Sequence, residues 1–401
     1  MKIQLSEEIL GIISRLEYAG HEAYVVGGSL RDALLGKESS DTDLTASALP
    51  EETAALFSDM RVIPTGIKHG TVTVLTNKGT AVEITTFRTD GEYSDSRHPD
   101  SVSFTRSLPE DLARRDFTVN AMAYAPEKGI VDLFGGREDL EKRCIRCVGD
   151  PAKRFSEDAL RILRAFRFSA QLGFSIEKNT LKGAIDLGDR LSVIARERVR
   201  VELFKLLSAP KPADALMMMS PIMRRVIPEV GIDEARFKLC DELAQDPIVR
   251  LAFLVFNSGN EKSVADGLRM SNADKARLLR LSSGCAEDIP DSPASARRLL
   301  ARFAAVPEDA VVLMDILGLV SDRDTSAAVS LLRGELSSSP CLTLARLAVD
   351  GKTIISEGIA EGRRVGALLD RLLCSVIDDP VLNDRESLLA LARRIVKENN
   401  L

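Results

Sequence analysis

Tryptophan is missing from this sequence, and aromatic residues make up only 4% of its 401 positions. An extended platform on which nucleic-acid bases stack is therefore not expected. The formal net charge is -6. This charge argues against a protein that coats nucleic acid through bulk electrostatics, because nonspecific binding depends on many Lys and Arg contacts to phosphate. Any contact with RNA must then be local.

Long apolar runs are also lacking. No uncharged apolar segment approaches the roughly 18 to 20 residues needed to span a bilayer. Glu7 and Glu8 interrupt the segment where a signal peptide would be apolar. We therefore expect a soluble, cytoplasmic protein with no membrane partner. Its length accommodates roughly two to four domains.

Cysteine and histidine are sparse, with six and three residues. Six cysteines are too few for a disulfide scaffold in a chain this long, and a cytosolic protein keeps its thiols reduced. Cys144 and Cys147 form a C-x-x-C pair, but zinc needs a second pair of ligands and no histidine is suitably spaced. We interpret the cysteines as small core residues.

The first third of the chain has the pattern of a mixed α/β unit. An amphipathic stretch over Leu5–Tyr18 predicts a helix. Short β-rich runs between Gly, Asp and Pro residues predict strands, namely Ala23–Val26, Thr71–Leu75, Ala81–Thr86 and Val119–Tyr124. From about Asp139 onward the periodicity is helical, with no convincing strand. The predicted fold class is α+β, a mixed sheet with helices followed by an all-α remainder.

A Gly-Gly turn follows the first predicted strand. Within Tyr24–Gly36 a strand, a turn and a short helix succeed one another, and we expect Ser29 to cap the helix. Glycines let the main chain approach a phosphate, a helix N-terminus offers unpaired N–H donors, and Arg31 adds a planar cation. The segment lacks G-x-G-x-x-G and G-K-[ST], which argues against Rossmann and P-loop sites. Taken alone, a Gly-Gly turn between a strand and a helix is usually a structural turn with no binding role.

Two acids follow at Asp41 and Asp43. On an extended segment, residues i and i+2 point to the same side, so their carboxylates converge. Mg²⁺ fits such a pair because it binds one or two carboxylates, waters and substrate phosphate oxygens. A solvated turn is the alternative for an isolated D-x-D, but the nearby Gly-Gly turn favours a site. Glu83 is either a third carboxylate, brought beside them by a neighbouring strand, or an ordinary exposed strand residue.

Two later segments carry polar groups beside apolar runs. Asp111–Ala123 contains two Arg, two Asp and an Asn, which suit a ribose and a triphosphate, although a charged loop before a strand is the alternative. Phe155–Phe168 predicts one helix with an apolar face and a free polar face. There, Asp158 offers an acceptor and Arg161 a donor, which matches the amino group and ring nitrogen of cytosine and adenine but not uracil or guanine. A surface salt bridge is the ordinary alternative.

Together these stretches resemble the class II tRNA nucleotidyltransferases, the CCA-adding enzymes, which share their catalytic head with bacterial poly(A) polymerases. The matching segments occur in family order: Gly27–Asp32, Asp41–Asp43, Arg114–Met122, Glu157–Arg161 and Glu197–Glu202.

The resemblance implies catalysis at the two acids. Asp41 and Asp43 would hold magnesium ions, Gly28 and Arg31 would bind the triphosphate, and Arg115 would contact the nucleotide near its sugar and phosphates. Two-metal chemistry would then join CTP and ATP to the 3′ end of tRNA without a nucleic-acid template.

The resemblance also implies how the base is chosen. Asp158 and Arg161 would form the templating pair, with Arg164 and Arg167 lining the same pocket. Thr65–Val72 looks like the CCA-adding branch, and Asp90–Pro99 fills the place of the loop needed for terminal A addition.

The family fold divides the chain into a head (1–140), a neck (141–205), a body (206–285) and a tail (286–401). The tail is expected to bind tRNA, and no obligate protein partner is evident. The alternatives within enzymes are an A-adding enzyme or a poly(A) polymerase. Those from other classes are an inactive RNA-binding scaffold and a small-molecule nucleotidyltransferase.

Overall fold

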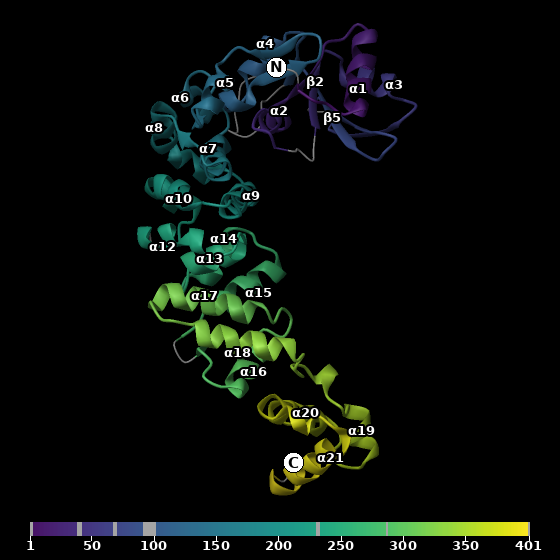
Figure 1. The fold of residues 1–401 in the computed structure, drawn as a ribbon, viewed down its shortest axis with the longest axis vertical. Helices are drawn as coiled ribbons and strands as arrows, with labels where there is room; N and C mark the ends of the chain where they lie inside the picture. The colour runs from purple at the N-terminus through teal and green to yellow at the C-terminus, as the bar shows by residue number, and fades with distance from the viewer. Residues whose placement is uncertain are drawn as a thin grey trace. The chain divides into compact units, whose positions relative to one another are not determined.

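The computed structural model describes residues 3–37, 42–66, 70–90, 102–229, 233–285 and 288–399. Figure 1 shows its elements in chain order. The chain forms two compact units. Unit 1 comprises Met1–Asp241 with Gly267–Arg269, and unit 2 comprises Glu242–Asp266 with Met270–Leu401.

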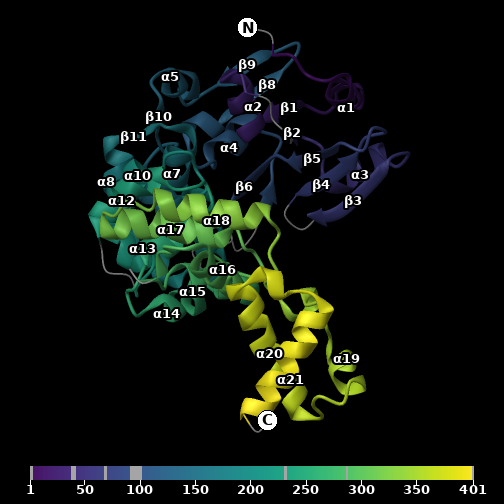
Figure 2. The same cartoon turned by 60° about the horizontal axis from the view of Figure 1, so that its bottom comes forward.

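Unit 1 begins with a seven-stranded mixed sheet in the order β3-β4-β5-β2-β1-β8-β9, whose strands are labelled in Figure 2. Neighbouring strands are antiparallel except β2 and β5, which are parallel. The bounds are β1 Ala23–Val26, β2 Thr42–Ala46, β3 Arg61–Gly66, β4 Thr71–Leu75, β5 Ala81–Thr86, β8 Met122–Ala125 and β9 Gly129–Asp132. A separate two-stranded sheet pairs β6 (Arg88–Asp90) with β7 (Val102–Phe104).

The sheet follows the hydrophobic pattern of the sequence. β1 is central and buried at every position, whereas β4 alternates between buried and half-buried residues, as expected where one face is covered. Helix α1 (Glu7–Tyr18) begins after Ser6, whose hydroxyl accepts a hydrogen bond from Ile9 N, and buries its apolar side. The predicted strands β1, β4 and β5 are confirmed, and the predicted helix begins two residues later than Leu5.

Three sequence predictions about local structure are wrong. The expected strand over Val119–Tyr124 is a 3-10 turn at Thr118–Asn120 followed by β8. Two short parallel strands, β10 (Cys144–Ile145) and β11 (Ser175–Ile176), occur in the stretch predicted to be all helix. Such strands are too short for a periodicity to show. The expected single helix over Phe155–Phe168 is broken, because Asp158 has an extended backbone (φ -137°, ψ 105°).

Helices make up most of the remainder, so the α+β prediction is confirmed. Those of unit 1 after α1 are α2 Gly27–Leu34, α3 Pro50–Leu56, α4 Leu108–Ala113, α5 Gly136–Glu141, α6 Pro151–Glu157, α7 Leu160–Leu172, α8 Lys178–Asp186, α9 Arg196–Leu207, α10 Ala213–Met219, α11 Met223–Val226 and α12 Glu234–Leu239. The predicted apolar face of α7 is confirmed, since Ile162, Leu163, Phe166 and Ala170 are buried.

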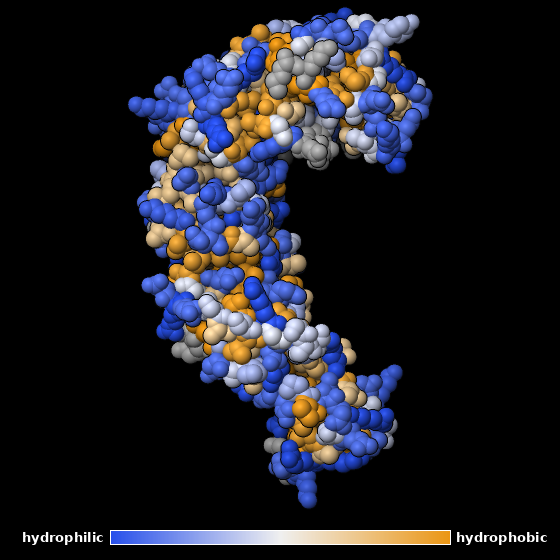
Figure 3. Space-filling view, in the orientation of Figure 1, coloured by the Kyte–Doolittle hydropathy of each residue, from blue (hydrophilic) through white to orange (hydrophobic). Residues whose placement is uncertain are grey.

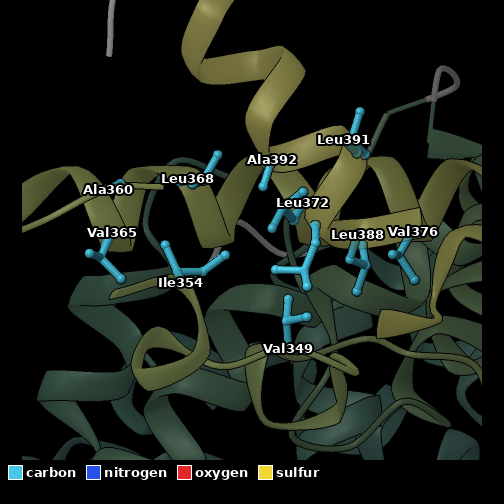
Figure 4. Packing of buried hydrophobic residues seen from close by; sticks show 11 residues of the cluster. Val349, Ile354, Ala360, Val365, Leu368, Leu372, Val376, Leu388, Leu391 and Ala392 are labelled. Atoms are coloured by element: carbon cyan, nitrogen blue, oxygen red, sulfur yellow. The ribbon is translucent and has the colours of Figure 1, made fainter. Parts of the chain in front are cut away.

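Unit 2 is helical in its described residues. Its helices are α13 Pro247–Leu254, α14 Glu261–Gly267 (which ends at the first residue of the short unit 1 segment), α15 Asn272–Leu281, α16 Pro293–Arg302, α17 Asp309–Ser321, α18 Ser326–Ser337, α19 Gly351–Ser356, α20 Arg363–Asp378 and α21 Arg385–Asn399. In its C-terminal part, Leu368 and Leu372 of α20 pack with Ile354 of α19 and Leu388 of α21 (Figure 4).

The surface mixes polar and apolar residues. The face drawn in Figure 3 is largely hydrophilic, with apolar residues between the charged ones. Exposed large apolar side chains include Leu133, Val193, Ile355 and Val381. Across the described residues, every helix is too short or too polar to cross a membrane.

Candidate active site

The Gly-Gly turn joins β1 directly to α2. Gly27 has a positive φ of 70°, which glycine adopts without strain. The prediction that Ser29 caps the helix is wrong, because α2 begins at Gly27 with Val26 as its N-cap. Ser29 instead lies within the first turn, where its hydroxyl donates to Val26 O (2.9 Å) and accepts from Asp43 N (3.4 Å). Ser29 therefore links the turn to β2.

The turn, one predicted carboxylate and one predicted arginine lie together. A Cβ added to Gly27 would lie 3.5 Å from Asp43 Oδ2 and 3.6 Å from Arg115 Nη1. The main chain at Gly27 thus approaches both an acid and a cation without an intervening side chain. A Cβ on Gly28 would lie 3.5 Å from Arg31 Nη2, which places the second cation next to the same turn.

The third acid lies on the adjacent strand. Asp43 on β2 is directly paired with Glu83 on β5 in the parallel register, and directly paired residues project to the same face of a sheet. The described residues hold no cluster of three His, Cys, Asp or Glu side chains suited to a metal. Asp41 lies outside the described residues, as do 67–69 and 91–99 of the predicted branch-specific segment and loop. Asp43 and Glu83 supply the hard oxygen donors that a divalent ion prefers.

A cavity of about 400 Å³ opens beside the Gly-Gly turn and Asp43, whereas Glu83 is exposed on β5 and is not part of the described lining. Its lining contains six arginines and three aspartates together with the turn: Gly27, Gly28, Arg31, Asp43, Arg114, Arg115, Asp116, Asn120, Asp158, Leu160, Arg161, Arg164, Phe168 and Arg198. Each of these arginines is paired with a carboxylate, Arg31 with Asp32 among them. Planar guanidinium groups have several N–H donors, and these match the oxygens of a phosphate.

A chain of polar contacts fixes one side of the cavity. Arg31 Nη1 donates to Asn120 Oδ1 (2.8 Å), and Asn120 Nδ2 donates to Asp116 Oδ1 (3.2 Å). Arg164 donates to Asp116 Oδ2 from Nε (2.8 Å) and Nη2 (2.5 Å). Burial alone would raise the pKa of Asp116, but Arg164 and the Asn120 amide outweigh it and lower the pKa to about 2. Asp116 therefore stays ionised and holds Arg164 at the cavity wall.

The predicted base-reading pair lies where two helices meet. Asp158 separates α6 from α7 and accepts from Leu160 N (3.0 Å) and from Arg198 Nη2 (3.1 Å). Arg161 donates to Glu157 Oε2 (2.7 Å) and to Arg114 O (2.9 Å). The prediction that Arg161 lies on a free polar face is wrong. The side chain is buried, and its partners belong to α6 and to the end of α4. Both Asp158 and Arg161 line the cavity.

One residue predicted to line the nucleotide pocket, Arg167, contacts other side chains. Arg164 lines the cavity, but Arg167 is absent from its described lining. Arg167 instead faces Glu202 of α9, with Nε 3.2 Å from Oε2, and lies over the Phe168 ring. Burial lowers the pKa of Arg167 to about 10, although the negative charge of Glu202 acts to raise it. Arg167 thus contacts Phe168, which lines the cavity, and the assignment of Arg167 to the nucleotide pocket stays a prediction.

Sequence reasoning named no role for several lining residues. Arg114, Asp116 and Asn120 fall inside a segment recognised as suited to a nucleotide, and Arg198 falls inside a segment matching the family. No local signal distinguishes which of these side chains reach the cavity. Phe168 has Arg31 and Arg164 over its ring at 5.2 and 5.4 Å. It lies four residues after Arg164 and seven after Arg161, so helical spacing on the same face was a signal that could have indicated it.

Known proteins match this chain throughout its length. The sequence profile described as "Poly A polymerase head domain" matches residues 23–146, and that described as "Probable RNA and SrmB- binding site of polymerase A" matches residues 173–230. The chain is 37% identical to a CCA-adding enzyme from Leuconostoc mesenteroides, covering 100% of both chains. It is 37% identical to another from Geobacillus thermodenitrificans, covering 98% of both.

Solved structures of CCA-adding enzymes also match this chain. The Bacillus stearothermophilus CCA-adding enzyme in complex with CTP superimposes with a TM-score of 0.82 at 33% identity, covering 98% of this chain and 99% of that one. The Thermotoga maritima CCA-adding enzyme complexed with tRNA superimposes with a TM-score of 0.67 at 20% identity, covering 98% and 96%. The second match shows the shared fold.

Proposed function

We propose, from the premise that this chain belongs to the family of CCA-adding enzymes, that its arginine-lined cavity binds CTP and ATP for transfer to the 3′ end of tRNA. Members of this family are nucleotidyltransferases, so the chain is an enzyme of that class. The observation that carries the proposal is the meeting of the Gly27 turn, Asp43 and Arg115 at one wall of the cavity, with Asp158 and Arg161 in the same lining.

The phosphate end of the nucleotide belongs near the Gly-Gly turn. Arg31 and Arg115 are placed to pair with triphosphate oxygens, and Gly28 lets the chain approach them closely. In-line transfer moves charge onto the departing pyrophosphate, and fixed guanidinium groups stabilise that charge without reorganising. No side-chain nucleophile is required.

Enzymes of this family use a divalent metal, and we assign it to Asp41, Asp43 and Glu83. The pairing of Asp43 with Glu83 and the choice of oxygen donors favour Mg²⁺ over softer ions. When bound, the ion would lower the pKa of the attacking 3′-hydroxyl and neutralise phosphate charge. The protein's part is to hold these carboxylates beside the arginines.

Base choice is assigned to Asp158 and Arg161. A carboxylate acceptor beside a guanidinium donor pairs with the amino group and ring nitrogen that cytosine and adenine share. Uracil and guanine would set a carbonyl against the carboxylate, a mismatch worth about 1–3 kcal/mol for each unpaired buried group. Glu157 and Arg198 contact these two side chains and favour one orientation of each. Arg164 completes this part of the pocket, and Arg167 supports it from behind.

We assign the binding of tRNA to the helical remainder of the chain. We propose the four-part division of head (1–140), neck (141–205), body (206–285) and tail (286–401), with the tail contacting tRNA in the cytoplasm. The head profile matches residues 23–146, close to the proposed head, whereas the two compact units divide at Asp241, inside the proposed body.

The proposed activity is tested by identifying the nucleotides that the purified protein adds to tRNA. tRNAs ending before CCA, after C and after CC are incubated with CTP, ATP and Mg²⁺, and the products are sequenced. Completion of CCA on all three supports the proposal. Extension of the CC-ending substrate alone would identify an A-adding enzyme, and a run of A residues a poly(A) polymerase.

Two variants test the assigned residues. Asp43→Ala is expected to abolish incorporation with an unchanged circular dichroism spectrum, while Asp59→Ala, an acid paired with Arg15 on the surface of the same unit, retains it. Normal turnover by Asp43→Ala, or equally by Asp41→Ala, would exclude the metal assignment.

Asp158→Ala is expected to accept UTP and GTP as well as CTP and ATP while still catalysing nucleotide incorporation. Asp186→Ala, which alters an exposed pair with Lys182 in the same helical region, is the matched control. Unchanged nucleotide selectivity in Asp158→Ala would eliminate the templating role.

A further inference from the structure

A buried acid outside the cavity contacts two of the arginines that line it. Asp111, in the last turn of α4, has no exposed surface and is not part of the cavity lining. Arg114 donates to its Oδ1 from Nε (3.1 Å) and Nη2 (2.6 Å). Arg115 donates to its Oδ2 from Nη2 (3.0 Å).

The same carboxylate also reaches the strand that carries Asp43. Thr45 lies two residues after Asp43 on β2. Its hydroxyl donates to Thr85 O (3.0 Å) and also lies 3.4 Å from Asp111 Oδ2. The carboxylate oxygen that accepts from Arg115 is therefore also in contact with β2. This shared acceptor sets where Arg115 lies relative to Asp43, next to the main chain of Gly27.

Within the part of the chain that the structure describes, the hydrogen bond to Asp111 is the contact that orients the Arg115 guanidinium. Its Nε is buried and, among the described atoms, has no hydrogen-bond partner. A guanidinium held at one edge by a carboxylate can be aimed, whereas one without that contact samples other rotamers. The charge on Asp111 persists in this environment: burial raises its pKa, but Arg115 and Arg114 outweigh burial and hold the pKa below its ordinary value.

The neighbouring main chain is fixed by the same group. Arg88 N donates to Asp111 Oδ1 (3.4 Å), and Arg88 O accepts from Arg114 Nε (3.1 Å). The carbonyls of Ala113 and Arg114 accept from Arg154 and Arg161. The end of α4 is thus held both by Asp111 and by contacts that do not involve its carboxylate.

We propose that Asp111 is a positioning residue for nucleotidyl transfer, which acts by fixing the Arg115 guanidinium relative to Asp43. The proposal rests on the function assigned to the cavity. Asp111 does not touch the nucleotide, and its effect passes through Arg115. An amide at this position would offer one acceptor oxygen and present an NH₂ donor to arginine donors, leaving part of the contact unmade.

A double-mutant cycle tests whether the effect passes through Arg115. The dissociation constant of CTP is measured by calorimetry for the wild type, Asp111→Asn, Arg115→Ala and the double variant, together with the rate of C incorporation. Loss of an outer group that orients a metal ligand typically costs about 10- to 100-fold, and we expect Asp111→Asn to weaken CTP binding and slow incorporation by a similar order. In the Arg115→Ala background, the same change should cost less than about 2-fold, the limit of independent behaviour. Equal losses in both backgrounds would overturn the proposal.

A matched control separates positioning from stability. Asp309 of unit 2 is also buried, and Arg277 pairs with it through Nε and Nη2. Asp309→Asn removes a comparable buried ion pair and should leave CTP binding unchanged. A similar loss of CTP affinity in Asp309→Asn would mean that general destabilisation explains the effect.

A second variant covers the case in which Asp111→Asn fails to fold. Asp111→Glu keeps the charge but moves the carboxylate by one methylene, so it should restore folding while incorporation remains slowed. Wild-type rate and affinity in Asp111→Glu would overturn the proposal. If the wild-type protein binds CTP but extends no tRNA, the assigned function fails, whereas the binding cycle still decides the role of Asp111.

Discussion

Replacing Asp116 with asparagine should destabilise unit 1 in a way that depends on pH. Asp116 is buried and receives two hydrogen bonds from Arg164, one from Asn120 Nδ2 and one from Phe117 N. Asp116→Asn keeps the shape of the side chain but removes its charge. Arg164, with a side chain 33% exposed, would then lack its counter-charge.

The magnitude follows from the pKa of the carboxyl. Its fall from an ordinary 3.8 to about 2 in the folded protein corresponds to roughly 2 kcal/mol of preferential interaction with the ionised form. Because the folded-state pKa is the lower one, this stabilisation is fully present above the ordinary pKa and is lost as pH falls through about 2. The difference between variant and wild type should therefore be complete at pH 7 and narrow below pH 4.

Urea unfolding followed by circular dichroism measures this difference. We expect the unfolding free energy of Asp116→Asn to be lower than that of the wild type by about 2 kcal/mol at pH 7 and by less at pH 3. Asp59→Asn alters an exposed Asp–Arg pair in the same unit and should unfold close to the wild type at both values. Equal stability of Asp116→Asn and wild type at pH 7, or a difference that acid does not reduce, would refute the reasoning.

Three other outcomes are expected. Burial raises the pKa of the Cys147 thiol to about 12, so iodoacetamide at pH 8 should label exposed Cys374 well before Cys147, as peptide mass spectrometry would show; equal labelling would contradict this. Leu372→Ala should destabilise the α19–α21 cluster of Figure 4 by about 2–5 kcal/mol, since Leu372 is fully buried; unchanged resistance of that segment to proteolysis would count against it. Gly136→Ala would bring a Cβ within 2.3 Å of Thr118 O and should lower the unfolding free energy by about 1–3 kcal/mol, with a lower melting temperature; an unchanged melting temperature would show that the turn can move aside.

Local features of the sequence determined much of the fold. β1 has the composition of a buried strand, β4 and β5 have the alternation of strands covered on one face, and α1 has its amphipathic period. These properties depend on neighbours along the chain, so they can be read without knowing the tertiary contacts. The Gly-Gly turn was recognisable for the same reason, because glycine freedom is a property of one residue.

The arrangement of the site was decided by contacts between distant segments. Glu83 lies opposite Asp43 because β5 pairs in parallel with β2 across 40 positions of sequence. Asp158 interrupts the predicted helix, and Arg198 reaches it from α9. Arg167 pairs with Glu202 of α9.

Local patterns thus identified the chemical groups of the site and the strands β1, β4 and β5, but not the break in the helix at Asp158. Packing between distant segments set which groups meet, buried Arg161, and paired Asp111 with Arg115. The physical reason is that periodicity and propensity act over a few residues, whereas burial and ion pairing depend on how separate segments pack.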